Sequence, residues 1–157
     1  PDGTVTAGNA CPLNDGAAAV VIMSDTKAKE LGLKPLARIV ATGVSGLSPE
    51  IMGLGPIEAV KKALGYAKMS VSDIDLFEIN EAFAVQVLGS ARALGIDEDK
   101  LNVSGGAIAL GHPFGMTGAR ITATLLNNLA THDKTFGIET MCVGGGQGMA
   151  MVVERLS

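Results

Sequence analysis

Short apolar stretches alternate with longer amphipathic stretches along this chain, and a glycine or a proline stands at most of the boundaries. Apolar runs of about four to eight residues flanked by turn residues are typical of strands, whereas apolar residues that recur every three or four positions are typical of helices. The pattern predicts strands at residues 17–23, 36–42, 75–79, 103–110, 136–142 and 149–154. It predicts helices at residues 25–31, 56–67, 80–94 and 117–131.

Strands that alternate with helices predict an α/β fold in which helices pack on a layered sheet. Only a short glycine loop separates the last two strands, so we expect them to form an antiparallel hairpin at one edge of the sheet. Residues 80–94 and 117–131 are apolar around most of the helix circumference. We therefore expect both helices to be covered on several sides, between two layers or beneath a docking partner.

The chain has 157 residues, of which 47% are hydrophobic, and this is enough for one domain with a hydrophobic core. Its net charge is −4 and it has no cluster of Lys or Arg, so we expect no nucleic-acid partner and no membrane association. Cys11 and Cys142 form no CxxC pair and no metal-ligand pattern. We expect no metal site and a reducing, cytoplasmic location. The chain opens at Pro1 rather than at a methionine, and we expect it to begin partway through a longer protein.

Three polar or reactive side chains follow expected strands directly: Asn80, His112 and Cys142. Ligands of open α/β sheets bind outside the carboxyl ends of the strands. A thiol, an imidazole and an amide together are suited to acyl transfer. The thiol attacks or transfers a proton, the imidazole acts as a base, and hydrogen-bond donors hold an oxyanion.

Each of these residues also has an ordinary structural explanation. Cys142 has the character of a small buried apolar residue, and His112 stands at a helix start, where a histidine often serves as a cap. Asn80 is placed to cap the helix expected to begin there, and Glu81 in the first turn suits the helix dipole. The glycines at 144–148 precede a strand rather than a helix, which argues against a phosphate-binding loop.

Five stretches, taken together and in order, resemble the thiolase family of acetyl-CoA acetyltransferases and 3-ketoacyl-CoA thiolases. They read "TAGNACPLNDGAAAVVIMS", "GLGP", "INEAFA", "GGAIALGHPFGMTGAR" and "MCVGGGQGMAMVVE", and they span nearly the whole chain. The resemblance implies a thiolase-like C-terminal domain over residues 17–157, with a mixed β-sheet and helices on both faces. It implies that residues 1–16 are the end of the loop domain or a linker.

The resemblance also implies catalytic roles for four residues. His112, in the GHP motif, would activate a nucleophilic cysteine, and Cys142, in the CxG motif, would move protons to and from the substrate. Asn80, in the NEAF motif, would hold a water that forms one oxyanion hole with the histidine, and the N–H of Gly144 would contribute to a second. The nucleophilic cysteine of the family lies in an N-terminal half that this sequence does not contain, so we expect this chain alone to be inactive.

Five further residues would bind substrate. The resemblance places Ala82 and Phe83 along the pantetheine tunnel, and Ala7 and Gly8 beside coenzyme A. Cys11 stands where many members of the family have a serine that contacts the pantetheine arm. Because a thiol is a weaker hydrogen-bond donor than a hydroxyl, we expect that contact to be weaker here.

The implied reaction is the Claisen condensation of acyl-CoA units or the thiolytic cleavage of a 3-ketoacyl-CoA. Its substrates are coenzyme A thioesters, and no further cofactor is implied. An acetyl-CoA acetyltransferase of fatty-acid and lipid metabolism is our first expectation. A longer-chain 3-ketoacyl-CoA thiolase is the alternative, and a non-catalytic thiolase-like module for binding or assembly is a third. The expected partners are acyl-CoA or CoA, the N-terminal thiolase half, and further copies in a homodimer or homotetramer.

Overall fold

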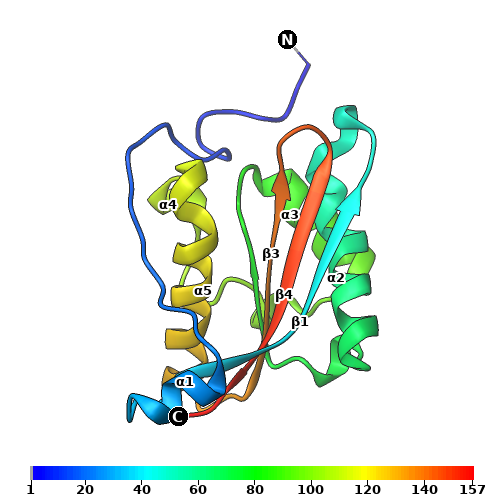
Figure 1. Ribbon diagram of the computed structural model, residues 1–157. Coiled ribbons are helices and arrows are strands. Elements are labelled where there is room, and N and C mark those ends of the chain that lie inside the picture. Colours follow the sequence, from blue (N-terminus) through cyan, green and yellow to red (C-terminus); the bar gives the residue numbers. More distant parts are fainter. Residues whose placement is uncertain (1) are drawn as a thin grey trace.

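A four-stranded mixed sheet forms the centre of the computed structural model, which describes residues 2–157 (Figure 1). The strands are β1 (Ala37–Gly46), β2 (Leu76–Ile79), β3 (Phe136–Val143) and β4 (Gln147–Arg155), in the order β1-β4-β3-β2. Strand β2 runs parallel to β3, whereas the β1–β4 and β3–β4 pairs are antiparallel. The expected hairpin is β3–β4, but it occupies the middle of the sheet rather than an edge. The reason is that β1 pairs with the outer side of β4 and β2 with the outer side of β3.

Helices cover both faces of the sheet (Figure 1). Helices α2 (Gly55–Ala67) and α3 (Ala84–Leu94) pack on one face, and α5 (Phe114–Thr131) packs on the other. Alternate residues of β2 divide between the two sides: Phe77 joins the core beneath α2 and α3, and Leu76 joins the core beneath α5. This alternation follows from the pleat of a strand. The predicted α/β fold with helices on both faces of a mixed sheet is therefore confirmed.

The remaining elements are short. Helix α1 (Asp25–Glu30) is capped by Ser24, whose hydroxyl accepts from the N–H of Lys27 at 3.1 Å. Helix α4 (Ala107–Leu110) is one turn long and stands directly before the connection to α5. Three 3-10 turns complete the regular structure of residues 2–157: η1 (Pro49–Leu54), η2 (Val71–Asp73) and η3 (Glu98–Lys100).

Three expected elements differ in the structure. Residues 17–23 form no strand within the described chain: they are exposed and have no regular secondary structure, because no neighbouring strand there offers backbone groups to pair with. Residues 103–110 form a turn followed by α4, because Gly105 adopts φ +78° and donates its N–H to the carbonyl of Asn102 at 2.7 Å. The helix expected at 80–94 begins only at Ala84.

The two helices expected to be covered on several sides each bury one side. Among residues 2–157 no second layer forms over α3 or α5. Val85 on α3 is 58% exposed and Phe114 on α5 is 87% exposed. Large exposed apolar patches usually mark an interface. Within the same residues, no helix is long and apolar enough to cross a membrane.

Candidate functional site

The carboxyl ends of β2 and β3 lie side by side, because these two strands are parallel neighbours. Asn80 directly follows β2, and its backbone N–H donates to the carbonyl of Thr140 at 3.0 Å. Cys142 lies two residues further along β3. The expectation that polar side chains lie at the ends of strands is therefore met by Asn80 and by Cys142, which is the second-last residue of β3. It is wrong for His112, because the residues before it form helix α4 rather than a strand. Figure 1 shows this end of β3 at the same end of the molecule as α4, the start of α5 and the N-terminal segment.

The side chain of Asn80 is buried without a partner. It is 1% exposed, and neither its Nδ2 nor its Oδ1 makes a hydrogen bond among residues 2–157. It does not cap a helix, because α3 begins at Ala84 with Phe83 as its N-cap. A buried amide without a hydrogen bond is costly. The Asn80 amide is therefore available to a water molecule or to a polar group of a ligand.

His112 lies in the connection between α4 and α5 and is half-buried. Its Nδ1 lies 2.6 Å from the Oγ1 of Thr117, and its ring packs at a tilt against Phe114 with 5.0 Å between ring centroids. The N-cap position of α5 is Pro113, so the histidine does not cap that helix. Burial, together with the positive charge of Arg120, lowers the pKa of His112. A neutral imidazole at this position is able to accept a proton.

Asn14 fixes the backbone that precedes His112. Its Nδ2 donates to the carbonyl of Leu110 at 3.1 Å. The next residue, Gly111, has φ +93°, and a Cβ added there would lie 1.7 Å from the Oδ1 of Asn14. Glycine is required at position 111 for both reasons, since other residues rarely adopt this conformation and the asparagine fills the space.

The N-terminal segment also pairs with the chain that follows Asn80. The N–H of Cys11 donates to the carbonyl of Ala82 at 3.1 Å, and Ala10 forms an antiparallel bridge with Phe83. These contacts bring Cys11, Ala82 and Phe83 together at one end of the molecule. Ala82 is buried, Cys11 is half-buried and Phe83 is exposed. Ala7 and Gly8, just before this pairing, are both exposed.

Cys142 is buried at the end of β3. Burial raises the pKa of its thiol, and the nearby Cys11 raises it further. Cys142 therefore carries its proton at neutral pH. Gly144 lies in the exposed glycine loop between β3 and β4, and no hydrogen bond among residues 2–157 occupies its backbone N–H. Neither Asn80 nor Cys142 is joined to His112 by a hydrogen bond between side chains in this part of the chain.

Four polar contacts near this edge could not be identified from the sequence. Glu81 stands outside α3, and its carboxylate accepts from the Nδ2 of Asn102 and from the N–H of Ile108, each at 3.0 Å. It therefore ties the segment after β2 to the start of α4, rather than facing a helix dipole. The other two contacts are the Thr117 hydroxyl at His112 and the Asn14 amide at Leu110, and only spacing in three dimensions reveals them.

A buried charged cluster lies between the sheet and α5. Glu78 of β2 and Glu139 of β3 are directly opposite each other, and the Nη1 of Arg120 is 4.0 Å from the Oε2 of Glu78. Asn128 donates to the other Glu78 oxygen at 3.1 Å. Burial raises the pKa of Glu78 to about 7 and that of Glu139 to about 8.

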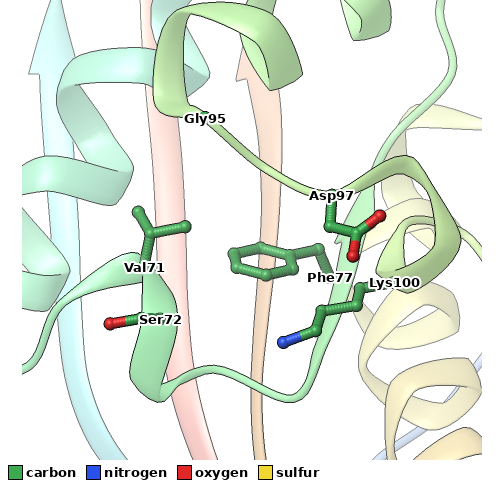
Figure 2. Close-up of a pocket in the computed structure, with 6 residues that line it drawn as sticks. All are labelled: Val71, Ser72, Phe77, Gly95, Asp97 and Lys100. Carbon is green, nitrogen blue, oxygen red and sulfur yellow. The ribbon is translucent and has the colours of Figure 1, made fainter.

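A surface hollow of about 380 Å³ lies elsewhere, where Phe77 meets the loops around η2 and η3. Figure 2 shows the Phe77 ring between Val71 on one side and Asp97 and Lys100 on the other. None of the residues expected to act in catalysis or substrate binding lines this hollow. The candidate site is therefore the end of the molecule where the sheet edge carries Asn80 and Cys142 and the connection between α4 and α5 carries His112.

Two family models match this chain. The family model described as "Thiolase, C-terminal domain" matches residues 33–155, and "Thiolase, N-terminal domain" matches residues 1–26. Acetyl-CoA acetyltransferase of Escherichia coli strain K12 is 57% identical over 155 residues, which are 99% of this chain and 39% of that protein.

Two solved structures have the same fold. The Bacillus anthracis acetyl-CoA acetyltransferase superposes with a TM-score of 0.96 at 53% identity, over 99% of this chain and 39% of that one. Human mitochondrial 3-ketoacyl-CoA thiolase in complex with CoA superposes with a TM-score of 0.92 at 48% identity, over 99% of this chain and 40% of that one. The chain thus spans about two fifths of the length of these relatives. The match of the C-terminal family model over most of the sequence, and the identity to these enzymes, make this chain a member of the thiolase family.

Proposed function

We propose that this chain supplies the C-terminal part of an acetyl-CoA acetyltransferase, which joins two acyl-CoA units or cleaves a 3-ketoacyl-CoA with CoA. The observation that carries the proposal is the convergence of Asn80 and Cys142 at one sheet edge, with the Asn80 amide buried and unpartnered among residues 2–157. Coenzyme A thioesters are the proposed substrates, without a further cofactor. The Bacillus anthracis and Escherichia coli relatives, both named as acetyl-CoA acetyltransferases, favour this activity.

The opposite pKa shifts of two side chains support distinct acid and base roles. His112 has a lowered pKa and is neutral near pH 7, so it is able to take the proton of a thiol. Cys142 has a raised pKa and remains protonated, so it is able to donate a proton to the substrate α-carbon and to recover it in the reverse reaction. Environments that push two pKa values apart are typical of acid–base pairs in active sites. Both roles require a nucleophilic cysteine from the N-terminal half.

The same proposal gives Asn80 and Gly144 the role of stabilising negative charge on thioester oxygens. A buried amide with free donors can hold a water molecule in a first oxyanion hole together with His112. The N–H of Gly144, free of hydrogen bonds within residues 2–157, would serve a second. The segment that contains Ala7, Gly8 and Cys11 pairs with Ala82 and Phe83, and we assign coenzyme A and its pantetheine arm to this end of the molecule. The human relative whose structure contains CoA favours that assignment.

An N-terminal thiolase half is the proposed main partner. Residues 17–23 carry exposed Val21 and Ile22 and have no strand beside them in the described chain, and Val85 and Phe114 expose further apolar surface. An additional sheet and helix layer would cover these side chains. We further propose a homodimer or homotetramer for the complete protein, a cytoplasmic location, and a place in fatty-acid and lipid metabolism.

A longer-chain 3-ketoacyl-CoA thiolase is the second candidate. It is favoured by the 48% identity and the TM-score of 0.92 to the human mitochondrial 3-ketoacyl-CoA thiolase, which are close to the values for the acetyltransferase structure. Comparing turnover of acetoacetyl-CoA with that of longer 3-ketoacyl-CoA substrates separates the two candidates.

A fusion protein tests the proposal. The N-terminal part of the Escherichia coli relative, which on this proposal would supply the nucleophilic cysteine, is joined ahead of this chain and assayed for CoA-dependent cleavage of acetoacetyl-CoA. We expect turnover from the fusion and none from the 157-residue chain alone. A folded fusion that binds CoA but has no turnover would instead support a non-catalytic binding module. Turnover by the chain alone would also contradict the proposal.

A further inference from the structure

The hydroxyl of Thr117 is the only polar side-chain group within hydrogen-bond distance of the His112 ring among residues 2–157. It lies 2.6 Å from Nδ1, and Thr117 itself is completely buried. The same hydroxyl lies 3.0 Å from the carbonyl oxygen of Pro113, one helical turn earlier. Thr117 therefore touches both the candidate base and the backbone at the start of α5.

A hydroxyl has one proton, and this fixes the direction of the two hydrogen bonds. The Pro113 carbonyl cannot donate, so the Thr117 hydroxyl must donate to it. The hydroxyl must then accept from the imidazole, which requires a proton on Nδ1 of His112. Only a proton on Nδ1 makes both contacts of the Thr117 hydroxyl hydrogen bonds. The free lone pair of the neutral imidazole is then on Nε2, which has no hydrogen-bond partner among residues 2–157.

We propose that Thr117 is a positioning residue that holds neutral His112 in the Nδ1–H tautomer, so that Nε2 is the basic nitrogen. This inference rests on the proposed role of His112 as a base. The opposite tautomer would place the proton on Nε2, and a neutral imidazole in that form has no free lone pair outside the Thr117 contact. Only a neutral imidazole has two tautomers. Because the pKa of His112 is lowered, its ring is neutral at neutral pH.

The chain offers a matched control on the same helix. Thr122 donates from its hydroxyl to the carbonyl of Gly118 at 2.8 Å, which is the same one-turn contact that Thr117 makes to Pro113. Thr122 does not contact His112. Replacing Thr122 with valine therefore removes a similar hydroxyl from α5 and leaves the imidazole contact in place.

Nitrogen NMR on histidine-labelled chain tests the tautomer directly, because His112 and the exposed His132 are the only histidines. At mildly alkaline pH we expect His112 to carry its proton on Nδ1 in the wild type, in Thr117→Ser and in Thr122→Val. In Thr117→Val the ratio of Nδ1–H to Nε2–H tautomer should fall by about 2- to 12-fold, the worth of one neutral hydrogen bond. The signals of His132 should not change.

Two results would overturn the inference: a wild-type His112 protonated mainly on Nε2, or an unchanged tautomer ratio in folded Thr117→Val. Should the valine variant fail to fold, the wild-type and Thr117→Ser spectra still decide the question. The measurement needs no enzyme activity. An inactive fusion protein with the expected tautomer would therefore count against the proposed function and leave the role of Thr117 in place.

Discussion

Glu78 and Glu139 stand directly opposite each other on the parallel strands β2 and β3, and both are buried against α5. Arg120 is the cation that acts on both carboxyl groups, and the charge of Glu78 further raises the pKa of Glu139. Two carboxylates beside one guanidinium cannot both ionise without leaving a buried negative charge uncompensated. This arrangement makes the stability of the domain depend on pH.

The first prediction concerns that dependence. The pKa of Glu139 is raised from 4.5 to about 8, so the folded state binds more protons than the unfolded state between these values. Stability should therefore fall as pH rises through this range. Glu139→Gln should stabilise the domain at about pH 8 by roughly 1–4 kcal/mol and change little at about pH 5. Urea unfolding over a pH series measures both effects.

The exposed Glu98 of η3 offers the control for this prediction. Glu98→Gln should leave the pH dependence of stability as it is in the wild type. Parallel curves of stability against pH for Glu139→Gln and Glu98→Gln would show that Glu139 does not set the pH dependence.

The second prediction concerns the glycine before His112. Gly111→Ala should lower the free energy of unfolding by about 1–3 kcal/mol, because the residue has φ +93° and the new methyl group meets Asn14. Gly65→Ala is the matched control: Gly65 lies in α2 with no atom within 4 Å of the added Cβ, so that change should stabilise by about 0.5–1 kcal/mol. Equal effects of the two substitutions in thermal or urea unfolding would show that neither the backbone conformation of Gly111 nor its close approach to Asn14 requires glycine there.

Most of the regular structure could be predicted from the sequence. Helix α2 buries Ala59, Val60, Ala63 and Leu64 on a single stripe, so its periodicity is plain. The hairpin β3–β4 is also plain, because a glycine turn joins two apolar strands. Its central position could not be predicted, since that depends on β1 pairing from more than a hundred residues away in the sequence.

The predictions that were wrong concern segments whose structure depends on contacts with other parts of the chain. Residues 17–23 have the composition of a strand, but the described chain offers them no strand to pair with. The segment from Asn80 to Phe83 has a helical pattern, yet it is not helical, because Ala10 and Cys11 pair with its last two residues. Local patterns cannot report a pairing partner that is distant in the sequence.

The candidate site was predictable only in part, because the sequence marks the ends of strands but not the contacts between distant residues. That Asn80 and Cys142 share an edge follows from two parallel strands, and the sequence marks both strand ends. Thr117 and Asn14 could not be identified, because their importance lies in one contact each, to His112 and to Leu110. The roles of His112, Asn80, Cys142 and Gly144 remain predictions that kinetics must test.

The third prediction concerns Cys11 in the active fusion protein. Its backbone pairs with Ala82, and its thiol lies near Cys142. If it contacts the pantetheine arm, Cys11→Ala should mainly raise KM by a factor of about 2 to 12, which corresponds to one hydrogen bond of about 0.5–1.5 kcal/mol. Cys11→Ser should lower KM, because a hydroxyl is the better donor. A large loss of kcat in Cys11→Ala would show that this thiol takes part in the chemistry.

The role of Cys142 is tested most directly by steady-state kinetics of the fusion protein with Cys142→Ala. The matched control is Cys11→Ala, the same substitution at a neighbouring thiol. If Cys142 transfers protons at the substrate α-carbon, kcat should fall by about 10²- to 10⁴-fold, the usual loss for a general acid or base. The KM should change little, because the role belongs to the transition state. A Cys142→Ala enzyme that keeps its kcat, beside a Cys11→Ala enzyme that loses it, would contradict the assignment of Cys142.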